Sequence, residues 1–367
     1  MTAWDADRFA RLRLARTNGI GPLTFRQLIS QYGSATEAVT RYPERVKRAG
    51  RSGHLLAPDR RIEQEIDRTE CYGATILFET DEAYPALFRA LSHPPPVITC
   101  FGRIDLLASE CVAMVGSRNA SAAAIRQAHD LARDLGQSGW TVVSGLARGV
   151  DTACHKGSLA TGTIAVIAGG IDNVYPAENK SLYEAIARDG LIISEAPFGL
   201  EPKARDFPRR NRLITGLSHG VVVVEAAKRS GSLISARTAL EQGREVMAIP
   251  GSPLDPRTQG SNGLIRSGAT LVENAEHVIE AIAPMILPRQ SDLFAEASLE
   301  TDDAEDAQVH VEDQQRLLEL LSPTPTSLSD LAVASQLPVR ICAIHLVELE
   351  LAGHAISLPG GLVQRAV

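Results

Sequence analysis

The sequence predicts an α/β protein whose main part is a doubly wound sheet, and three observations support this prediction. Short apolar segments alternate with helical patterns from about residue 71 to residue 284. Most of these segments are apolar at successive positions, as expected of parallel strands that helices cover on both faces. Glycine-rich turns follow several of them, where the helix of each βα unit would begin. This pattern is typical of a Rossmann-like domain.

The chain has 367 residues, which is room for two or three domains. We predict an N-terminal helical domain over residues 1–70, the Rossmann-like domain over 71–287 and a small winged-helix-like domain over 312–367. Residues 288–311 include the most acidic stretch, Glu300–Asp306, and few large apolar side chains. We predict a flexible linker there, although an ordered acidic helix is an alternative.

In the N-terminal segment, apolar residues at helical spacing flank the turn Gly19-Ile20-Gly21. Two short helices joined in this way resemble a helix-hairpin-helix, in which backbone N–H groups of the hairpin bind a DNA phosphate. An ordinary corner between two helices, with glycine supplying the turn, explains the same residues. The net charge of +4 over residues 1–70 favours DNA slightly. The basic run from Arg41 to Arg51 is expected to be a solvated face.

The central segment contains six candidate strands. They are Val112–Val115, Thr141–Ser144, Thr163–Ala168, Leu191–Ser194, Val221–Glu225 and Glu245–Ile249. Between the first two, a helix over Ala122–Ser138 would place Ile125, Ala128, Ala132 and Leu135 on one apolar face. Open α/β sheets bind ligands beyond the carboxyl ends of their strands, so the turns that follow these strands are the candidate site.

Two of these turns combine glycine, serine and arginine. The first, Gly116–Ser121, would aim N–H groups and a helix N-terminus at one point, and Arg118 adds a cation with a bidentate fork. A phosphate would fit there, although a glycine turn with a surface arginine would look the same. The second turn, Ser144–Asp151, brings Arg148. We expect Asp151 to cap the helix that follows, and His155 to be a partly buried, hydrogen-bonded residue rather than a catalytic one.

A dense basic run follows at residues 203–212, with five cations, one acid and Phe207 between them. Cations for phosphates and a ring for a base would suit a single strand of nucleic acid. A solvated charged face is the alternative. Lys180 would begin a helix near the same edge of the sheet.

The C-terminal segment has the outline of a winged helix. Helical patterns cover Gln315–Leu321, a second helix capped by Ser327–Asp330, and a third from Pro338 to about Ala352; Gly353–Val363 would form a hairpin wing. The third helix offers Arg340 against Glu348 and Glu350, whereas a helix that reads DNA should be basic. We therefore expect a protein-contact or regulatory role here.

Composition excludes several functional classes. The net charge of −7 and isoelectric point of about 5.8 argue against a protein that coats DNA, but residues 285–367 alone carry −9. Aromatic residues make up 4%, too few for the base-stacking platforms of an RRM or OB-fold. The five cysteines are odd in number and widely spaced, which indicates reduced thiols rather than a disulfide framework or a zinc site.

We also expect a cytoplasmic protein that binds neither metal nor cofactor. The sequence has no apolar run of the roughly 18 residues that a membrane span needs. Acids in Met1–Asp7 are unlike the basic start of a signal peptide. A nucleophile elbow, paired carboxylates on one loop and metal-ligand spacing are all lacking, which argues against an enzyme. The alternative is a Rossmann-type nucleotide enzyme such as a nucleoside-monophosphate phosphoribohydrolase, but Ser230–Leu233 stands where such enzymes have Pro-Gly-Gly-x-Gly-Thr.

Residues 72–284 strongly resemble the bacterial DNA-processing protein A (DprA, or Smf) family. The matching segments are Val115–Arg118, Val143–Gly149, Phe207–Ile214, Glu225–Ala226, Ser230–Leu233, Gly243–Val246, Pro250–Gly251, Leu264–Ile265 and Gly268–Ala269. Many members of this family have a sterile-alpha-motif-like or helix-hairpin-helix segment before the Rossmann domain and a small winged-helix-like domain after it.

The resemblance implies a protein that binds single-stranded DNA in a basic pocket of its Rossmann domain and forms tail-to-tail homodimers through that domain. It implies that the protein loads RecA recombinase onto incoming DNA during natural transformation, protects that DNA from nucleases and has no catalytic activity. Matched residue by residue, and with Phe207 added from the basic run, the expected DNA-binding residues are Gly116, Ser117, Arg118, Ser144, Gly145, Arg148, Lys180, Phe207, Arg210 and Asn211.

Overall fold

The computed structural model describes residues 4–48, 55–286, 306–337, 339–358 and 362–366. The chain divides into two compact units, Met1–Leu287 and Pro288–Val367. Most of the predicted linker, residues 288–305, lies outside the described residues, and residues 306–311 belong to a helix.

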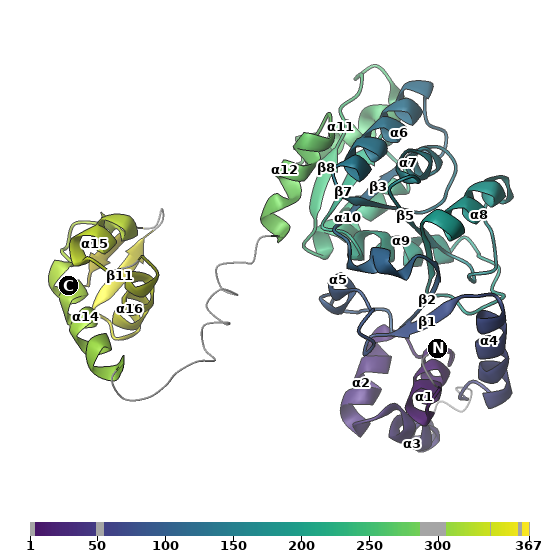
Figure 1. Ribbon diagram of the computed structural model, residues 1–367, viewed down its shortest axis with the longest axis horizontal. Coiled ribbons are helices and arrows are strands. Elements are labelled where there is room, and N and C mark those ends of the chain that lie inside the picture. Colours follow the sequence, from purple (N-terminus) through teal and green to yellow (C-terminus); the bar gives the residue numbers. More distant parts are fainter. Residues whose placement is uncertain (1–3, 49–54, 287–305, 338, 359–361, 367) are drawn as a thin grey trace. The chain divides into compact units, whose positions relative to one another are not determined.

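Four helices open the first unit: α1 (Ala6–Ala15), α2 (Pro22–Tyr32), α3 (Ala35–Arg48) and α4 (Asp59–Cys71). Their apolar positions fall into two groups. One group joins α1, α2 and α3 around Leu14 and Phe25. The other packs Leu12 and Ile62 against Ile76 and other residues of the first two strands. Helices α1 and α4 therefore lie directly beside β1 and β2 (Figure 1).

A nine-stranded sheet forms the centre of this unit. Its strands are β1 (Thr75–Phe78), β2 (Val97–Gly102), β3 (Cys111–Gly116), β4 (Thr141–Ser144), β5 (Thr163–Ile167), β6 (Leu191–Ser194), β7 (Gly220–Val224), β8 (Glu245–Ala248) and β9 (Thr270–Leu271). The spatial order is β1-β2-β6-β5-β4-β3-β7-β8-β9. In this spatial order, the seven strands from β6 through β3 and β7 to β9 are parallel, as in a Rossmann fold. At one end, β2 pairs antiparallel with β6, and β1 pairs antiparallel with β2.

Helices cover both faces of the sheet, as the sequence predicts. One face packs against α6 (Ala122–Gln137), α7 (Val150–Ser158), α8 (Lys180–Asp189) and α12 (Ala275–Ile286). The other packs against α5 (Ala86–Arg89), α9 (Asp206–Gly216), α10 (Ser232–Glu241) and α11 (Gln259–Arg266). Short 3₁₀ turns lie at Ile104–Ala108, Ala177–Asn179 and Pro256–Thr258. Successive residues of the buried strands, such as Val112 and Ala113, pack into the cores on opposite faces of the sheet.

The six predicted strands are all present, but the prediction of the sheet was incomplete. The antiparallel pair β1–β2 and the two-residue edge strand β9 were missed, so the sheet is mixed at one end. Ile125 was placed wrongly on the apolar face of α6. It is 42% exposed, and the buried positions of that helix include Ala124 and Leu131 as well as Ala128, Ala132 and Leu135.

The second unit has the predicted winged-helix outline. Its elements are α14 (Asp306–Leu320), β10 (Thr326–Ser327), α15 (Leu328–Ser335), α16 (Val339–Leu351), β11 (Ala355–Leu358) and β12 (Leu362–Arg365). Ser327 caps α15 by accepting a hydrogen bond from the Asp330 backbone N–H, as its sequence position predicts. The wing strands β11 and β12 pair antiparallel, and Leu317, Leu346 and Val363 are part of a separate small core.

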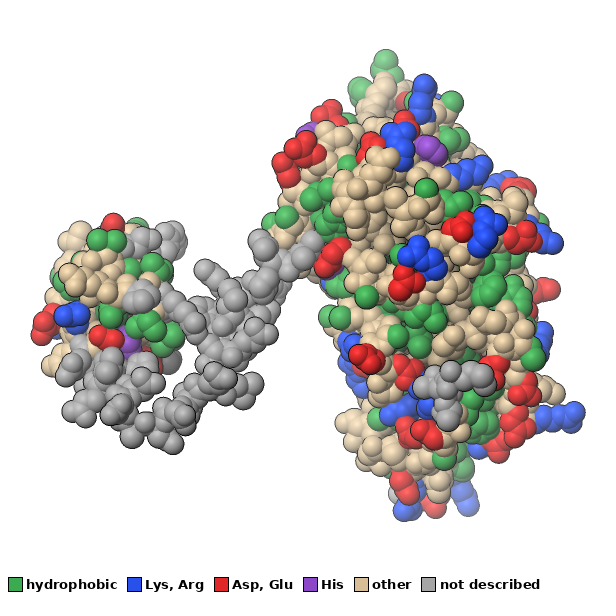
Figure 2. Space-filling model, viewed as in Figure 1, with side chains coloured by type: hydrophobic (Ala, Val, Ile, Leu, Met, Phe, Trp, Pro, Cys, Tyr) green, Lys and Arg blue, Asp and Glu red, His purple; other side chains and the backbone are tan. Residues whose placement is uncertain are grey.

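On the face of the first unit that Figure 2 shows, basic and acidic side chains are interspersed rather than separated by sign. Any basic site on this face therefore depends on the local geometry of a few residues. Among the described residues, no helix combines the length and apolar character that crossing a bilayer requires.

Candidate nucleic-acid interface

The turns that follow the parallel strands meet at one edge of the sheet. Strand order reverses between β3 and β7, because the chain continues outward from β3 through β4, β5 and β6 before returning to β7 on the other side. Ligands of open α/β sheets bind at such a switch point. Two neighbouring cavities lie there, of about 520 Å³ over β3 and β7 and about 260 Å³ over β4 and β5. We call this edge the rim.

Gly116 ends β3 where three elements converge. A Cβ atom on Gly116 would lie 2.0 Å from the Val224 carbonyl oxygen and 2.6 Å from a Val150 methyl group. Only glycine fits between β7 and α7 at this point, and its absent side chain lets the turn start close to the sheet. The following residues, Ser117 and Arg118, therefore project beyond the strand ends, where Arg118 is exposed.

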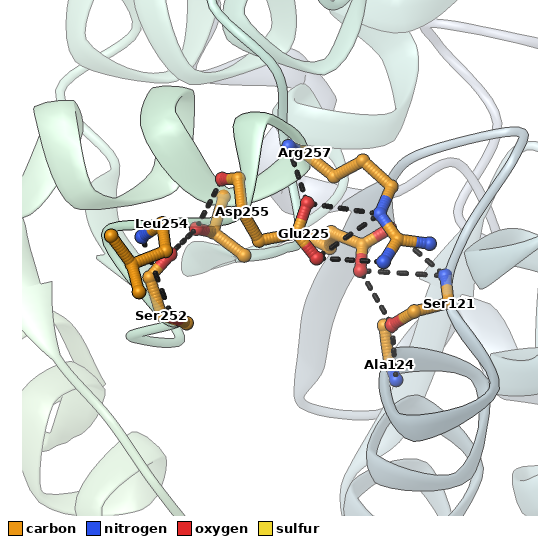
Figure 3. A network of polar contacts seen from close by, with 8 residues as sticks. Ser121, Ala124, Glu225, Ser252, Leu254, Asp255 and Arg257 are labelled. Carbon is orange, nitrogen blue, oxygen red and sulfur yellow. Dashed lines mark hydrogen bonds and ion pairs between the residues drawn. The ribbon is translucent and has the colours of Figure 1, made fainter.

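Ser121 and Glu225 fasten this turn to the end of β7 (Figure 3). Ser121 caps α6 by accepting a hydrogen bond from the Ala124 N–H at 3.1 Å, and its hydroxyl donates to Glu225 Oε2 at 2.6 Å. The Ser121 backbone N–H also donates to Glu225 at 3.0 Å. Glu225 is buried and has a left-handed backbone conformation, with φ of 53°. A strained backbone in a buried residue persists only where the surrounding structure holds it, and it often marks a functional site.

We predict that Glu225→Ala lowers the free energy of unfolding by about 1–3 kcal/mol, because the Ser121 donors lose their acceptor in a partly buried site. The same change should loosen the Gly116–Ser121 turn and weaken any ligand bound by it. Glu225→Gln, which keeps an acceptor oxygen, is the matched control. Urea denaturation measures both variants; equal stability of the alanine variant and wild type would show that the contact does not hold the turn.

Arg118 lies over the ring of Phe207, in the first turn of helix α9, and that ring packs against Tyr175, in the turn after β5. The Arg118 guanidinium carbon is 5.3 Å from the centre of the Phe207 ring, and the Phe207 and Tyr175 ring centres are 5.3 Å apart. Tyr175 is 50% exposed. All three residues line the smaller rim cavity together with Arg148 and Glu178. A cation beside two partly open rings can hold a phosphate and stack a base.

Arg210 occupies a different position from the one that its place in the basic run suggests. It is 6% exposed, and its Nη1 donates to the backbone carbonyl oxygens of Gly145 and Val166. A Cβ on Gly145 would come within 2.7–2.8 Å of the guanidinium, so glycine is needed where the two meet. Burial lowers the pKa of Arg210 while Asp151 raises it, and Arg210 stays charged at neutral pH. In this structure the Arg210 side chain connects β5 to the turn after β4 through these two hydrogen bonds.

Asp151 does not cap α7 as predicted; Gly149 is the N-cap residue and contributes no side-chain hydrogen bond. The Asp151 carboxylate instead accepts a hydrogen bond from the Ala147 N–H at 3.2 Å, which folds the second turn over the start of the helix. Burial raises the pKa of Asp151, and the nearby Arg210 opposes this shift. Asp151 and Arg210 thus lie buried together beneath the rim.

His155 is buried as predicted, and more completely. Its Nδ1 is 2.9 Å from the Thr163 hydroxyl, which donates its own hydrogen to the Val142 carbonyl oxygen, so Nδ1 must carry the ring proton. Nε2 is buried without a hydrogen-bond partner. Burial therefore lowers the pKa of His155 to about 3. A neutral, enclosed ring of this kind supports the sheet and is not placed for proton transfer with a ligand.

His155 should make stability depend on pH. Its pKa is about 3 in the folded protein and about 6.5 in the unfolded chain, so between these values the unfolded state binds the extra proton. The free energy of unfolding should therefore fall as pH falls from 6.5 toward 3, by about 1.4 kcal/mol per pH unit from this residue. His155→Gln should remove that part of the slope in denaturation series at pH 6 and pH 4; identical slopes in both proteins would contradict this.

The other predicted site residues divide by exposure. Arg148 and Lys180 are exposed and lie 3.9 Å and 4.0 Å from Glu178 and Glu184, in weak surface pairs that leave them open to a ligand. Asn211 is half-buried and lines the larger rim cavity with Ser117. Ser144 is fully buried, and its hydroxyl donates to the Met114 carbonyl oxygen at 2.7 Å. Ser144 can therefore act on a ligand only through the shape of its turn, whereas Gly145 and Arg210 also line the smaller rim cavity.

The basic run 203–212 also divides. Lys203, Arg205 and Arg209 are exposed, whereas Arg210 is buried and Arg212 pairs with Glu195 at 2.5 Å. The sequence therefore overstated the free charge of this segment. Tyr175 was not among the predicted site residues, because a tyrosine before a proline in a loop belongs to no periodic pattern.

The arrangement can bind an extended anion but offers no obvious reaction centre among the described residues. The cavities contain backbone turns, arginines and aromatic rings. No cluster of three or more potential metal ligands occurs within the parts of the chain that the structure covers.

Comparison with known families gives three matches in chain order. The family described as DNA recombination-mediator protein A matches residues 75–283. A DprA-like N-terminal helix-hairpin-helix domain matches residues 5–67, and a DprA winged-helix domain matches residues 300–361. The three matches follow the order of the helical segment, the Rossmann-like sheet and the winged helix.

Curated relatives match most of the chain. Protein Smf of Escherichia coli is 36% identical over 84% of this chain and 82% of its own length. Protein Smf of Synechocystis is 30% identical over 96% of this chain and 98% of its own. DNA processing protein DprA of Bacillus subtilis is 41% identical over 55% of this chain and 69% of its own.

Two solved structures share the fold. DNA processing protein A from Streptococcus pneumoniae is 32% identical, with a TM-score of 0.62, over 76% of this chain and 98% of that one. DNA processing protein A from Helicobacter pylori is 30% identical, with a TM-score of 0.53, over 57% of this chain and 96% of that one. The latter structure is described as giving insight into a single-stranded-DNA binding mode.

Proposed function

Because this chain belongs to the DNA recombination-mediator protein A family, we propose that it is a DNA-processing protein that binds single-stranded DNA along the rim of its Rossmann-like sheet. Single-stranded DNA is the ligand that the printed description of the Helicobacter pylori relative names. The backbone would run along the turns after β3, β4 and β5, with phosphates near Arg118 and Arg148.

The observation that carries this proposal is the grouping of Arg118, Phe207 and Tyr175 in one cavity. The three come from two turns and the start of helix α9, far apart in the sequence, yet the rings lie 5.3 Å apart and the guanidinium lies over one of them. A single strand needs both a cation for its backbone and an open ring for its unpaired bases. Double-stranded DNA has its bases stacked inward and cannot use the rings in this way.

The proposal extends to the cellular role that the family resemblance implies. The protein would protect incoming single strands and load RecA recombinase onto them during natural transformation, without catalysing a reaction itself. We place it in the cytoplasm, where its five free cysteines would remain reduced. Recombinase loading is tested by whether the purified protein lets RecA assemble on oligonucleotides that are already coated with single-strand-binding protein; no acceleration would count against it.

A homodimer through the Rossmann-like domain forms part of the proposal. Leu240 on α10, Leu254 before α11 and Leu271 on β9 are 63%, 90% and 45% exposed, and β9 is a sheet edge. Exposed apolar side chains beside an open edge favour pairing with a second copy. Leu240→Glu combined with Leu271→Glu should reduce the sedimentation mass from twice the chain mass of 39.3 kDa to once that mass. A wild type that sediments as a monomer would contradict the dimer.

We propose a protein-contact role for the winged-helix unit. Val333, Val347 and Ile356 are 80%, 56% and 41% exposed, which gives this unit apolar side chains at its surface rather than a basic reading helix.

Fluorescence anisotropy with oligo-dT and with a duplex of equal length tests the main proposal. The protein should bind the single strand more tightly than the duplex. The logarithm of the association constant should fall by about 0.7 per log unit of salt concentration for each phosphate engaged. Equal affinity for single and double strands, or affinity independent of salt, would overturn the proposed mode.

A further inference from the structure

The smaller rim cavity contains an acidic residue that the binding of phosphates does not explain. Glu178 lines this cavity together with Arg118, Arg148, Tyr175 and Phe207. A carboxylate repels the phosphates of a strand, so it weakens the attraction that the two arginines provide. A hydrogen-bond acceptor at this position is suited to a different part of the nucleotide.

The backbone around Glu178 is held in place. Glu178 lies in the 3₁₀ turn Ala177–Asn179, which leads into α8. Asn179 is 7% exposed, and its Nδ2 donates hydrogen bonds to the Leu146 carbonyl oxygen at 2.8 Å and to the Thr152 hydroxyl at 3.0 Å. These bonds attach the 3₁₀ turn to the turn after β4 and to α7, so Glu178 keeps its place in the cavity wall.

The Glu178 carboxylate lies beside Arg148 and is still open to a ligand. Its Oε1 is 3.9 Å from Arg148 Nη1, which is longer than a hydrogen bond. The Glu178 and Arg148 side chains are 65% and 59% exposed, so the pair is weak. No hydrogen bond to this carboxylate occurs among the residues that the structure describes. Because Arg148 lines the same cavity, a ligand there can donate to the carboxylate.

Tyr175 is the ring on which a base can stack. The guanidinium carbons of Arg118 and Arg210 lie 5.3 Å and 5.9 Å from the centre of the Phe207 ring, whereas no cation lies over Tyr175 among the described residues. Tyr175 is also 50% exposed. A flat base that stacks on a ring keeps its hydrogen-bonding edge free. Glu178 follows Tyr175 by three residues and lines the same cavity, which places its carboxylate to accept from that edge.

A carboxylate distinguishes the four bases by their hydrogen-bond donors. Its oxygens only accept, so the base must supply the hydrogen. Cytosine and adenine each carry an amino group on the Watson–Crick edge, and guanine carries an amino group beside a ring N–H. Thymine has one ring N–H between two carbonyl oxygens, which repel a carboxylate. A carboxylate beside a stacked base therefore favours cytosine, adenine and guanine over thymine.

We propose that Glu178 accepts a hydrogen bond from a base stacked on Tyr175, and that the rim therefore prefers bases with an amino group over thymine. Arg148 holds a phosphate while Glu178, beside it, accepts from the base, so the pair matches the two ends of one nucleotide. This inference rests on the proposed function, because it concerns the strand that lies on the rim. It gives that site a base preference, which contacts to phosphates alone cannot supply.

Fluorescence anisotropy with oligo-dC and oligo-dU of equal length tests this preference. The two bases have the same size and differ on the Watson–Crick edge. Cytosine has an amino group and a bare ring nitrogen there, whereas uracil has a carbonyl oxygen and a ring N–H. A mildly alkaline buffer keeps cytosine unprotonated. Wild type should bind oligo-dC roughly five- to tenfold more tightly than oligo-dU.

Glu178→Gln tests whether this residue causes the preference. A glutamine amide both donates and accepts, so it can pair with either base, and the preference for oligo-dC should fall to about twofold or less. Glu37→Gln is the matched control. Glu37 is an exposed residue of α3 that pairs weakly with Arg41 at 3.6 Å, so its replacement changes the net charge equally and should keep the full preference.

The possible results separate this inference from the proposed function. Equal affinity of wild type for oligo-dC and oligo-dU would overturn the inference and leave the proposed function intact. An undiminished preference in Glu178→Gln would show that another residue reads the base, which overturns the assignment to Glu178. If wild type binds neither oligonucleotide, the proposed function itself fails. Circular dichroism of both variants establishes that a changed preference does not come from unfolding.

Discussion

Replacing Arg118 by glutamate should weaken binding of single-stranded oligo-dT by roughly 100-fold or more. Arg118 is exposed at the end of β3, and its guanidinium lies over the Phe207 ring inside a rim cavity. Loss of a charge-assisted contact costs about 1.5–3 kcal/mol, and a carboxylate beside a phosphate adds repulsion. Arg118→Ala should weaken binding less than Arg118→Glu, because alanine removes the contact without adding repulsion.

Arg188→Glu provides the matched control for Arg118. Arg188 is an exposed arginine in the last turn of α8, where it pairs with Asp189 at 2.8 Å. The two variants change the net charge of the protein equally, so any general loss of attraction for DNA appears in both. A comparable loss of affinity in Arg118→Glu and Arg188→Glu would mean that the rim is not the specific site.

Replacing Arg210 by methionine should lower the free energy of unfolding by about 2–5 kcal/mol, because two buried hydrogen-bond acceptors lose their donor at about 1–3 kcal/mol each. The change leaves the carbonyl oxygens of Gly145 and Val166 without their donor and removes the nearby guanidinium that opposes the effect of burial on the pKa of Asp151. Methionine fills most of the volume, so the loss reflects charge and hydrogen bonds more than packing.

Arg209→Met is the control for Arg210, because Arg209 is the preceding residue in α9 and is exposed. A surface change of this kind should alter stability by no more than about 0.5 kcal/mol. Guanidinium denaturation of both variants measures the difference. Similar midpoints for the two would show that Arg210 is not the buried support that the structure indicates.

The sequence predicted the parallel part of the sheet because its strands are buried on both faces. Segments such as Val221–Val224 are continuously apolar, and the glycine turns after them mark where the helices begin. The pair β1–β2 was missed because its strands lack the long helix of a βα unit. Only the four-residue helix α5 lies between them. Strand β9 has only two residues, both exposed, so no pattern could reveal it.

The sequence also located the edge of the sheet that forms the candidate site, but not the role of each residue there. Arg209 and Arg210 are neighbours of the same type, and only the packing of α9 makes one exposed and the other buried. Tyr175 meets Phe207 across a gap of more than 30 residues, which no local pattern encodes.

Photo-cross-linking tests most directly whether the rim binds DNA. An oligo-dT with photoreactive thymine analogues would be irradiated with the full chain and the attached peptides identified by mass spectrometry. Stacking on the rim predicts cross-links to the peptides that contain Tyr175 and Phe207, because these two rings lie together in the cavity beside Arg118. Cross-links confined to the winged-helix unit, with none at either ring, would contradict the account.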